Sequence, residues 1–419
     1  MWKFFRKQYK KKLGNSLCLA KWTQSNIYLA AGTTHSCHHP LPHKIPLEEI
    51  QADPSALHNT CYKKKQRQMM LNDERPSECD YCWRVEDTGS ISDRITKSFT
   101  SWSRPFYDQI KDNNLDVPKY LEVSFDNTCN LKCSYCGPTY SSKWAEELNQ
   151  LGDWPNHHSK QSVIPNREHN PYIDAFWKWW PNIQNELHTF RITGGEPLLS
   201  KHTFRIIEKL KQNPNKKLTL GINTNLSVSK TVLEKFVKQV KDLKVKNLVI
   251  HTSCDAYGSA AEYARHGFNY NKWLENCNFI LQELPNAKLD IMVTYSAFSV
   301  TTFVKLLKDI KTLKGPWYKR SRTTVSIGYL RNPSQLAVWI LPYAYIYYIE
   351  DQINFMKENK FSSTEINQLQ RIETLFKSYE GDNRSLQKLF KEFVDEHDKR
   401  RNTNFLKSIP HMENVYYES

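Results

Sequence analysis

Long apolar runs are missing from the sequence, both at its start and along the rest of the chain. A membrane-spanning helix needs roughly 20 mostly apolar residues, so we expect no membrane segment and no membrane partner. The basic stretch Met1–Lys12 is not followed by the apolar stretch that forms the core of a secretory leader. These absences argue against a membrane protein and a secreted protein, and we expect a soluble protein of the cytoplasm.

Cysteine, in contrast, is abundant, because the chain of 419 residues contains ten. In a reducing compartment such cysteines indicate metal or redox sites rather than disulfides. The 59 basic residues outnumber the 44 acidic ones and give a net charge of +15. This excess suits an acidic partner such as a nucleic acid, a nucleotide or an acidic peptide. Scattered lysines also make an ordinary solvated surface, and we prefer that interpretation.

Strand-like and helix-like segments alternate through the middle of the chain, which predicts parallel βα units. The helical patterns between the strands include residues 204–211, 231–241 and 273–284. After about residue 341 apolar residues recur at helical spacing, and Ser362 with Glu365 fits a capping box. The predicted strands are Tyr120–Phe125, His188–Ile192, Leu218–Ile222, Leu248–Thr252, Leu289–Tyr295 and Thr324–Tyr329.

We expect three parts: a small α+β cysteine-rich unit over residues 1–117, a parallel α/β core over 118–340, and helices over 341–419. An insertion at about residues 151–186 interrupts the core and contains aromatic and basic residues. Such side chains can stack on nucleic-acid bases, and the insertion could lie over an active site as a lid. We prefer a packing role, in which Phe176–Trp180 forms an aromatic helix against the core.

Three cysteines follow the first predicted strand of the core, in the spacing Cys129-x3-Cys133-x2-Cys136. Three thiolates are one fewer than the four that usually hold a [4Fe–4S] cluster, so one iron is left for a ligand from outside the protein. A structural zinc site would instead favour C-x2-C pairs and four ligands. The next strand leads into residues 193–197, Thr-Gly-Gly-Glu-Pro, where two glycines offer bare backbone and the acid offers a carboxylate.

The two motifs together, with the aromatic Tyr135 just before the last cysteine, resemble those of the radical SAM superfamily. The resemblance implies a partial (β/α)6 barrel with its chemistry on loops after the carboxyl ends of the strands. It implies that the three cysteines bind a [4Fe–4S] cluster whose fourth iron chelates S-adenosylmethionine, with Tyr135 near the adenine. Gly194, Gly195 and Glu196 would then bind the methionine amino group. Reductive cleavage would release methionine and a 5′-deoxyadenosyl radical, which abstracts a hydrogen atom from a substrate.

The ends of two further predicted strands, at residues 223–225 and 253–255, resemble segments that hold the ribose and the methionine carboxylate in the same superfamily. Strand-end polar residues often only cap the next helix, and Arg265 could instead form a surface ion pair, so these alternatives stay open. Cys254 is a candidate catalytic thiol that returns a hydrogen atom to a product radical, although a lone cysteine there is more often an apolar filler. By the resemblance, the residues of these strand ends that bind the cofactor are Asn223, Asn225, Ser253, Asp255 and, as a carboxylate clamp, Arg265.

The first 117 residues contain a second set of cysteines. A predicted β-hairpin over Ile27–Thr34, with Gly32 at or near its turn, lies between the first two of them. The order of cysteine, hairpin, Gly-x4-Cys and C-x2-C resembles the twitch or SPASM accessory domain. Because no cysteine lies between residues 82 and 129, the shorter twitch form fits better. By that resemblance the ligands of a second, auxiliary [4Fe–4S] cluster are Cys18, Cys37, Cys79 and Cys82.

The second set also has alternatives. In most of the superfamily the accessory domain follows the barrel, whereas here it precedes it. The same four thiolates would satisfy a zinc ion, and Cys61 could replace one of them. Structural or surface roles are expected for His35, His38, His39 and His43.

Superfamily members with such accessory domains mostly modify peptides, proteins or small metabolites. We therefore expect an oxidoreductase that oxidatively modifies a peptide or protein, with an electron donor such as flavodoxin or ferredoxin. The net charge and the aromatic insertion suit a nucleotide or nucleic acid as an alternative substrate. A third alternative is a metal-stabilised nucleic-acid-binding protein without catalysis. No peptide-binding winged-helix segment precedes the barrel, which weakens the peptide prediction slightly.

Overall fold

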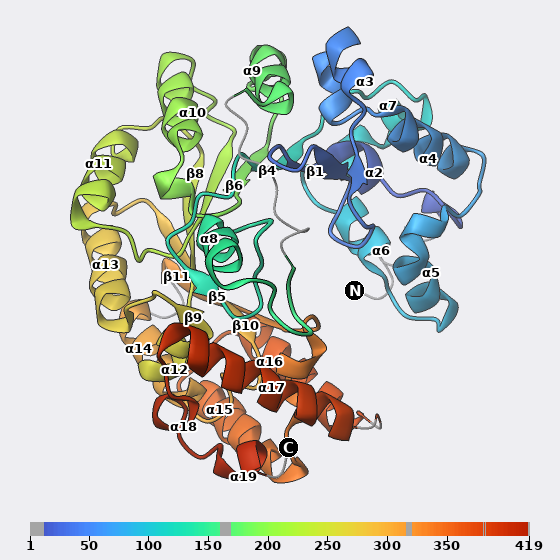
Figure 1. Ribbon diagram of the computed structural model, residues 1–419. Helices are drawn as coiled ribbons and strands as arrows, with labels where there is room; N and C mark the ends of the chain where they lie inside the picture. The colour runs from blue at the N-terminus through green and yellow to red at the C-terminus, as the bar shows by residue number, and fades with distance from the viewer. Residues whose placement is uncertain (1–11, 160–168, 316–320, 380, 382, 418–419) are drawn as a thin grey trace.

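The computed structural model describes residues 12–159, 169–315, 321–379, 381 and 383–417. Its centre is a nine-stranded sheet in the order β11-β10-β8-β7-β6-β4-β1-β2-β3. Figure 1 shows the N-terminal unit, in blue, beside one end of this sheet and the C-terminal helices, in red, near the other. A separate two-stranded ladder joins β5 (Lys132–Cys133) to β9 (Arg265–His266).

Six neighbouring strands of the sheet are parallel and follow one another in chain order. Among the described residues the first and last of these strands do not pair, so the barrel is partial and open. The predicted parallel α/β fold class and all six predicted strands are therefore confirmed. The six strands are β4 (Tyr120–Ser124), β6 (Thr189–Thr193), β7 (Thr219–Thr224), β8 (Asn247–Ser253), β10 (Lys288–Tyr295) and β11 (Thr323–Tyr329).

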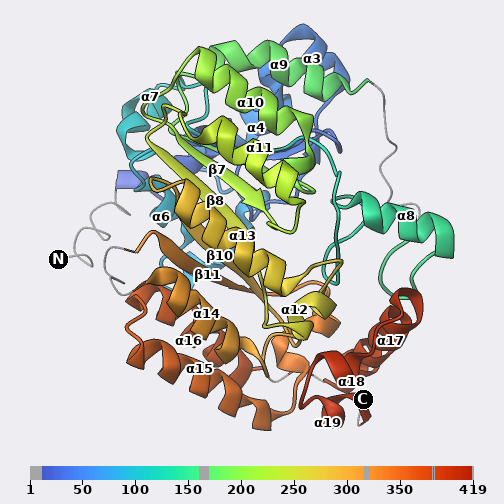
Figure 2. The same cartoon turned by 90° about the vertical axis from the view of Figure 1, so that its left-hand side faces the viewer.

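The helices of this part are α8 (Ser142–Leu151), α9 (Pro171–Ile183), α10 (Lys201–Gln212), α11 (Lys230–Val240), α12 (Ser259–Ala264), α13 (Tyr270–Glu283) and α14 (Phe303–Lys314). Figure 2 shows α10, α11, α13 and α14 covering one face of the strands. Successive side chains of a strand point to opposite faces. On β4, Leu121 and Val123 are fully buried while Tyr120 and Glu122 are only half-buried. The face opposite the helices therefore presents polar side chains on which a site can form.

The N-terminal unit joins the same sheet. Its strand β1 (Gln24–Tyr28) pairs in parallel with β4. The predicted hairpin is confirmed, because β1 pairs antiparallel with β2 (Thr33–His35) and Gly32 in the turn has a positive φ of 62°. The boundary predicted between residues 117 and 118 thus crosses a continuous sheet. The other elements of the unit are β3 (His43–Lys44), α2 (Ala20–Thr23), α3 (Leu47–Ala52), α4 (Cys61–Leu71), α5 (Asp80–Asp87), α6 (Asp93–Ser98) and α7 (Tyr107–Lys111).

The insertion near residues 151–186 contains α9 and the segment before it, of which residues 160–168 lie outside the described part. On α9, Phe176, Trp179 and Trp180 are buried, and Phe176 meets Phe125 edge-on with ring centres 5.0 Å apart. The burial of these rings supports the packing role predicted for the aromatic helix.

Helices follow the last strand, as predicted. The capping box of Ser362 and Glu365 is present at the start of α16, and Glu365 also accepts a hydrogen bond from the backbone N–H of Val325 in β11 at 3.0 Å. No helix in the described part is long and apolar enough to span a membrane. The C-terminal helices are α15 (Ile346–Glu358), α16 (Ser363–Lys377), α17 (Arg384–Arg401), α18 (Phe405–Ser408) and α19 (Glu413–Tyr417). Short 3-10 helices are η1 (Pro54–Leu57), η2 (Ser77–Cys79), η3 (Arg104–Phe106), η5 (Pro197–Leu199), η7 (Ser334–Leu336), η8 (Val338–Ile340) and η9 (Tyr343–Tyr345).

Candidate functional site

Three of the predicted metal ligands lie on the loop between β4 and α8, at the carboxyl edge of the parallel strands. Cys133 belongs to β5, where it pairs with Arg265 of β9. The indole N–H of Trp144 in α8 donates to the carbonyl of Cys133 at 2.9 Å. A ladder and a helix thus hold the middle of the loop. This segment, residues 125–141, is called the cysteine loop below and carries Cys129, Cys133 and Cys136.

A C-terminal helix also supports the cysteine loop. Arg401 of α17 donates to the carbonyl of Lys132 at 3.0 Å and forms an ion pair with Glu147 of α8. Both side chains of this pair are nearly inaccessible to solvent, at 0% and 3% exposure. A buried arginine with a carboxylate partner and a backbone acceptor fixes the distance between the elements that it joins. The helices predicted after residue 341 therefore help to form the site.

The three thiols of the cysteine loop act on one another electrostatically. Burial, together with the smaller effect of the charge of Cys133, raises the pKa of Cys129 to about 12. Burial and the two neighbouring thiols also raise the pKa of Cys136. Three thiolates can occupy this loop together only when a cation offsets their charge. Three convergent thiolates are the donor set of a [4Fe–4S] cluster with one open iron, so the residues present fit that group.

The two glycines after β6 allow the chain to approach the start of the cysteine loop. A Cβ atom on Gly195 would lie 2.2 Å from the carbonyl oxygen of Thr128, and a Cβ on Gly194 would lie 2.6 Å from Ser124 Oγ. Gly194 also has a φ of 114°, which side chains disfavour. The backbone N–H of Glu196 then donates to the carbonyl of Thr128 at 2.7 Å. The pair is therefore needed for close contact within the protein, while its approach to the methionine amino group stays a prediction.

The carboxylate of Glu196 is buried and joins the ends of β6 and β7. It accepts hydrogen bonds from the backbone N–H of Leu198 at 3.0 Å, from Thr224 Oγ1 at 2.6 Å and from the backbone N–H of Asn225 at 2.7 Å. Burial raises the pKa of Glu196 to about 7, and these three bonds oppose that rise. Asn225 in turn donates to Asn130 of the cysteine loop at 2.8 Å. Glu196 and Asn225 thus position the loop, and their contact with a cofactor stays a prediction.

Asp255 and Arg265 form a buried ion pair behind the cysteine loop. Arg265 donates to the two carboxylate oxygens of Asp255 at 2.8 and 3.0 Å, and its third nitrogen, Nη1, lies 3.7 Å from Cys133 Sγ. The hydroxyl of Tyr135 donates to Asp255 at 2.7 Å, and the backbone N–H of Thr294 donates to it at 2.8 Å. The predicted carboxylate clamp is therefore occupied by a carboxylate of this chain. Binding of a cofactor by these side chains stays a prediction.

Polar side chains line the open face of the sheet, and most of them were not predicted from the sequence. Asn223, a predicted cofactor ligand, accepts a hydrogen bond from Arg191 Nε at 2.7 Å. His251 Nδ1 lies 3.0 Å from Asp290, which also accepts a hydrogen bond from Ser326 at 2.9 Å. On β6 and β8 half-buried residues such as Arg191 and His251 alternate with fully buried ones, so alternation within the predicted strands was a signal that could have identified these two. Ser253, at the end of β8, is half-buried on the same face.

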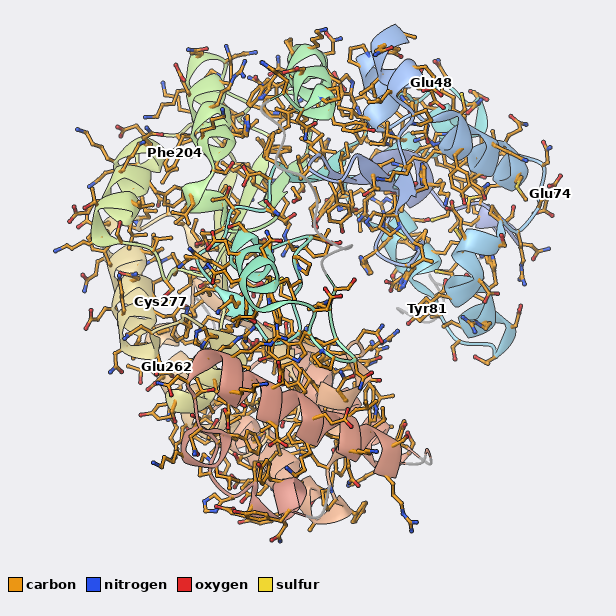
Figure 3. All side chains as sticks on the ribbon, in the orientation of Figure 1. Glu48, Glu74, Tyr81, Phe204, Glu262 and Cys277 are labelled. Atoms are coloured by element: carbon orange, nitrogen blue, oxygen red, sulfur yellow. The ribbon has the colours of Figure 1, made fainter. Side chains whose placement is uncertain are left out.

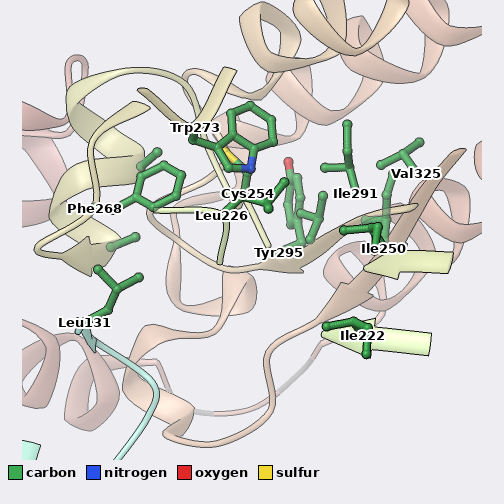
Figure 4. Packing of buried hydrophobic residues seen from close by; sticks show 14 of the residues in the cluster. Leu131, Ile222, Leu226, Ile250, Cys254, Phe268, Trp273, Ile291, Tyr295 and Val325 are labelled. Carbon is green, nitrogen blue, oxygen red and sulfur yellow. The ribbon is translucent and has the colours of Figure 1, made fainter. Parts of the chain in front are cut away.

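Cys254 lies in the hydrophobic core. It is 0% exposed, packs with residues such as Trp273 (Figure 4), and its thiol donates to the carbonyl of Ala256 at 3.3 Å. This packing favours the role of an apolar filler over that of a hydrogen donor to a substrate. Transfer of a hydrogen atom from Cys254 to a product stays a prediction that no contact supports.

The structure brings the second set of cysteines to a single pocket in the N-terminal unit. Cys61 is exposed at the start of α4 and does not line this pocket. His39 does line it and lies 2.8 Å from Asp93, with its ring stacked on Tyr81 of α5, which Figure 3 labels. The pocket, called the N-terminal cysteine site below, is lined by Cys18, Cys37, Cys79 and Cys82.

The charges around the N-terminal cysteine site fit a bound metal group. Burial raises the pKa of Cys79 to about 12, so these thiols are neutral unless a cation is present. Lys63 is 1% exposed, and within the described part of the chain its amino group donates to the hydroxyls of Ser25 and Thr34, at 2.9 and 2.7 Å. Burial lowers the pKa of Lys63 well below its ordinary value, whereas a thiolate at Cys37 raises it. A negatively charged group of four thiolates, around either zinc or a [4Fe–4S] core, would favour the charged form of this lysine.

Comparison with known proteins finds similarities in the central part of the chain. Residues 123–310 match the family model of the Radical SAM superfamily. Molybdenum cofactor biosynthesis protein moc-5 of Caenorhabditis elegans is 27% identical over 213 residues, 50% of this chain and 30% of that protein. GTP 3′,8-cyclase of Aliarcobacter butzleri is 30% identical over 131 residues, 31% of this chain and 33% of the cyclase. The aligned segments thus span about a third of the length of these relatives.

Among solved structures, Streptococcus suis SuiB bound to S-adenosylmethionine aligns with a TM-score of 0.40 at 13% sequence identity. That alignment covers 81% of this chain and 70% of SuiB. SuiB bound to the precursor peptide SuiA aligns with a TM-score of 0.39 at 12% identity, over 82% of this chain and 70% of SuiB. At these scores the similarity establishes neither a shared fold nor a shared function.

Proposed function

We propose that this protein, whose residues 123–310 match the Radical SAM family model, reductively cleaves S-adenosylmethionine and abstracts a hydrogen atom from a substrate. The observation that carries the proposal is the close contact between the two motifs. Glu196 and Gly195 sit directly against Thr128, the residue before the first cysteine of the loop. The segment that would bind the methionine amino group therefore lies beside the segment that would hold the cluster.

Cys129, Cys133 and Cys136 would hold a [4Fe–4S] cluster with one open iron, which when bound supplies the electron that cleaves the cofactor. The other residues position this loop and shield it. Arg265 donates toward Cys133 Sγ and thereby stabilises negative charge on that sulfur. Asp255 keeps the guanidinium in place. Trp144 and Arg401 donate to carbonyls of the loop and so hold it against α8 and α17.

The substrate proposed first is a peptide or protein, which the enzyme modifies oxidatively. The open face of the sheet supports a polar substrate, because Arg191, His251 and Asp290 present hydrogen-bonding groups there. Substrate recognition by a few polar groups in a concave site is the usual arrangement of small-molecule and side-chain sites.

A nucleotide or nucleic acid is the second candidate substrate. Its support comes from the relatives that are named GTP 3′,8-cyclase and from the net charge of +15. The two candidates can be distinguished by measuring substrate binding at increasing salt concentration. The affinity for an anionic nucleic acid falls steeply with ionic strength, according to the number of phosphates that the protein contacts.

The N-terminal cysteine site would hold an auxiliary [4Fe–4S] cluster in a twitch-like unit over residues 1–117, with zinc as the competing occupant. Its four cysteines converge on one pocket, which supports a common metal group. A small acidic electron carrier such as flavodoxin or ferredoxin would reduce the catalytic cluster. Thiolate ligands require a reducing compartment, and the cytoplasm is the proposed location.

The test begins with protein purified without oxygen. Iron, sulfide and zinc are measured, and the protein is then reduced in the presence of S-adenosylmethionine and assayed for 5′-deoxyadenosine. About eight irons per chain with 5′-deoxyadenosine support two clusters, and about four irons with one zinc support the catalytic cluster alone. Zinc alone without cleavage would favour a metal-stabilised nucleic-acid-binding protein and reject the proposal.

A single substitution makes this test specific. Cys133→Ala removes one ligand of the cysteine loop and should abolish 5′-deoxyadenosine formation, while the exposed Cys61, replaced by alanine, serves as the matched control. Substantial cleavage by the Cys133 variant would contradict the assignment of the loop.

A further inference from the structure

A groove with a volume of about 560 Å³ lies along α10 and α11, two neighbouring helices on the outer side of the sheet (Figure 2). The two helices carry four and three basic residues against one acidic residue each. Part of the excess positive charge of the chain, +15 in total, therefore gathers on this surface. The groove, called the basic groove below, is lined by Lys201, His202, Phe204, Arg205 and Lys211 of α10 and by Gln239 of α11.

The cations of the basic groove can be reached by a partner. The side chains of Lys201, Arg205 and Lys211 are exposed, and Glu208 adds one carboxylate to the wall. The guanidinium of Arg205 lies over the ring of Trp177 in α9, at 3.9 Å from the ring centre. A ring orients a cation without neutralising it. The basic groove therefore presents positive charge in a defined place to a negatively charged partner.

The aromatic rings at this surface are covered in part by side chains of the same chain. Phe125 stacks on Trp177 with ring centres 6.0 Å apart, in addition to the contact with Arg205. The ammonium of Lys235 in α11 lies 4.6 Å from the centre of the Phe204 ring. Proteins that bind single-stranded nucleic acid stack the bases on open aromatic faces. The covered rings therefore favour an acidic protein over a nucleic acid as the partner of the basic groove.

The basic groove reaches the cysteine loop through one layer of aromatic side chains. His202, which lines the groove, stacks on Phe125 with ring centres 5.2 Å apart. Phe125 is the first residue of the cysteine loop and precedes Cys129. The hydroxyl of Ser200, just before α10, donates to the carboxylate of Asp126 in the same loop at 2.6 Å. A partner in the groove therefore lies beside the segment that leads into the first cysteine.

We propose that the basic groove is the docking surface of the small acidic redox protein that supplies the electron for cleavage of S-adenosylmethionine. This inference rests on the proposed function and assigns its electron donor to one surface of the chain. Carboxylates around the redox group of the carrier would pair with Lys201, Arg205 and Lys211. Complexes that transfer electrons bury little area, and complementary charge guides and orients such partners. Exposed cations around a surface groove suit this kind of complex.

The step at this surface is the transfer of one electron. The carrier is oxidised by one electron, which passes to the metal group that the cysteine loop would hold, and no bond forms or breaks in the docked pair. Electron transfer slows steeply with distance, so the carrier must bind near the loop. The contact between His202 and Phe125 brings the basic groove to that position.

The first readout is binding. Flavodoxin, an acidic carrier, is titrated by calorimetry into the full chain purified without oxygen, at low and at high salt. The groove variant carries Lys201→Glu, Arg205→Glu and Lys211→Glu. Since steering charges change association by roughly tenfold to a thousandfold, this variant should bind flavodoxin at least about tenfold more weakly at low salt. The difference should shrink at high salt, where exposed charges are screened.

The second readout is the rate of 5′-deoxyadenosine formation with reduced flavodoxin, divided by the rate with dithionite, a small reductant that needs no docking surface. Both rates come from one preparation, so a loss of iron cancels in the ratio. The groove variant should lower this ratio about tenfold, and the milder variant with Lys201→Gln and Lys211→Gln should lower it less.

The matched control reverses three exposed lysines of α14, which Figure 2 shows at the other end of the row of outer helices from α10. Lys305→Glu, Lys308→Glu and Lys311→Glu change the net charge by the same amount as the groove variant. Affinity and ratio should stay close to those of the unsubstituted chain, because these lysines lie outside the basic groove.

The outcomes separate this inference from the proposed function. An unchanged affinity or an unchanged ratio in the groove variant, or an equal loss in the α14 variant, overturns the docking surface. A groove variant that binds flavodoxin normally but no longer binds a single-stranded oligonucleotide overturns it in favour of a nucleic acid. The radical SAM proposal then still stands if the unsubstituted chain forms 5′-deoxyadenosine with dithionite. If neither reductant yields 5′-deoxyadenosine, the proposed function fails, and the role of the basic groove fails with it.

Discussion

Replacing Gly195 by alanine tests whether the glycine pair supports the cysteine loop or only admits the cofactor. The new Cβ would lie 2.2 Å from Thr128 O and 2.7 Å from the carbonyl carbons of Asn127 and Thr128. All three atoms are backbone atoms of the segment that leads into Cys129, so the clash cannot be relieved by rotation of a side chain. The backbone or the loop must move.

The expected cost follows from overpacking, which destabilises a well-packed site by about 1–3 kcal/mol. Since about 1.4 kcal/mol corresponds to a factor of ten, we expect roughly fivefold to 140-fold weaker retention of iron by the cysteine loop. The assay is the rate of iron release to a chelator in the absence of S-adenosylmethionine. The N-terminal cysteine site should keep its metal, because Gly195 does not line the pocket of that site and its four cysteines lie far from Gly195 in the sequence.

Gly328→Ala is the matched control. A Cβ there would meet only Val293 O at 3.8 Å, an ordinary contact. Neither glycine has a positive φ, so the two variants differ in the clash and not in backbone strain. If the Gly195 variant keeps its iron as well as the Gly328 variant does, the structural argument is refuted. If it keeps iron but loses affinity for S-adenosylmethionine, the approach of the cofactor to the glycine backbone is supported instead.

Three further predictions concern the support of the two sites. Asp255→Asn leaves Arg265 as a buried charge without its partner, so the free energy of unfolding from urea titration should fall by about 3–5 kcal/mol, and a loss below about 1 kcal/mol would contradict the buried pair. Burial lowers the pKa of His397 from its ordinary 6.5 to about 4. The folded state therefore favours neutral His397, and the free energy of unfolding should fall by about 2 kcal/mol as the pH is lowered from 7.5 to 5. The variant His397→Gln should show a weaker dependence of this free energy on pH, and an equal dependence would reject the pKa shift of His397. Cys82→Ser should remove about half of the iron if each site holds four irons, whereas Cys61→Ser should remove none, and equal iron in both variants would favour zinc or no metal at the N-terminal cysteine site.

The parallel core could be predicted because its signals are local. Each strand such as Leu289–Tyr295 is a short apolar-rich run, and the helices between strands repeat at helical spacing. The place of β1 could not be predicted. Its sequence, Gln-Ser-Asn-Ile-Tyr, pairs in parallel with β4 about a hundred residues later, and a parallel pairing over that distance leaves no mark in the local pattern.

In the candidate site, too, the residues of local motifs could be predicted from the sequence, whereas contacts between distant segments could not. Spacing identified Cys129, Cys133 and Cys136, since a metal-binding loop is a local motif. The bond between Arg265 and Asp255 was missed although both residues had been selected, because their pairing depends on how β8 and β9 fold together. The same reasoning applies to Arg401, which lies far along the chain from the loop that it binds.

The insertion of β1 beside β4 also determines what happens when the protein is divided. In the intact chain β1 occupies the hydrogen-bonding edge of β4 along its whole length. A fragment that began at residue 118 would expose that edge as a row of unpaired N–H and C=O groups next to the apolar interior. Such an edge is a template for pairing with other chains. The parallel core cut out alone is therefore an aggregation hazard, and studies of it in isolation should retain β1, which covers the edge of β4.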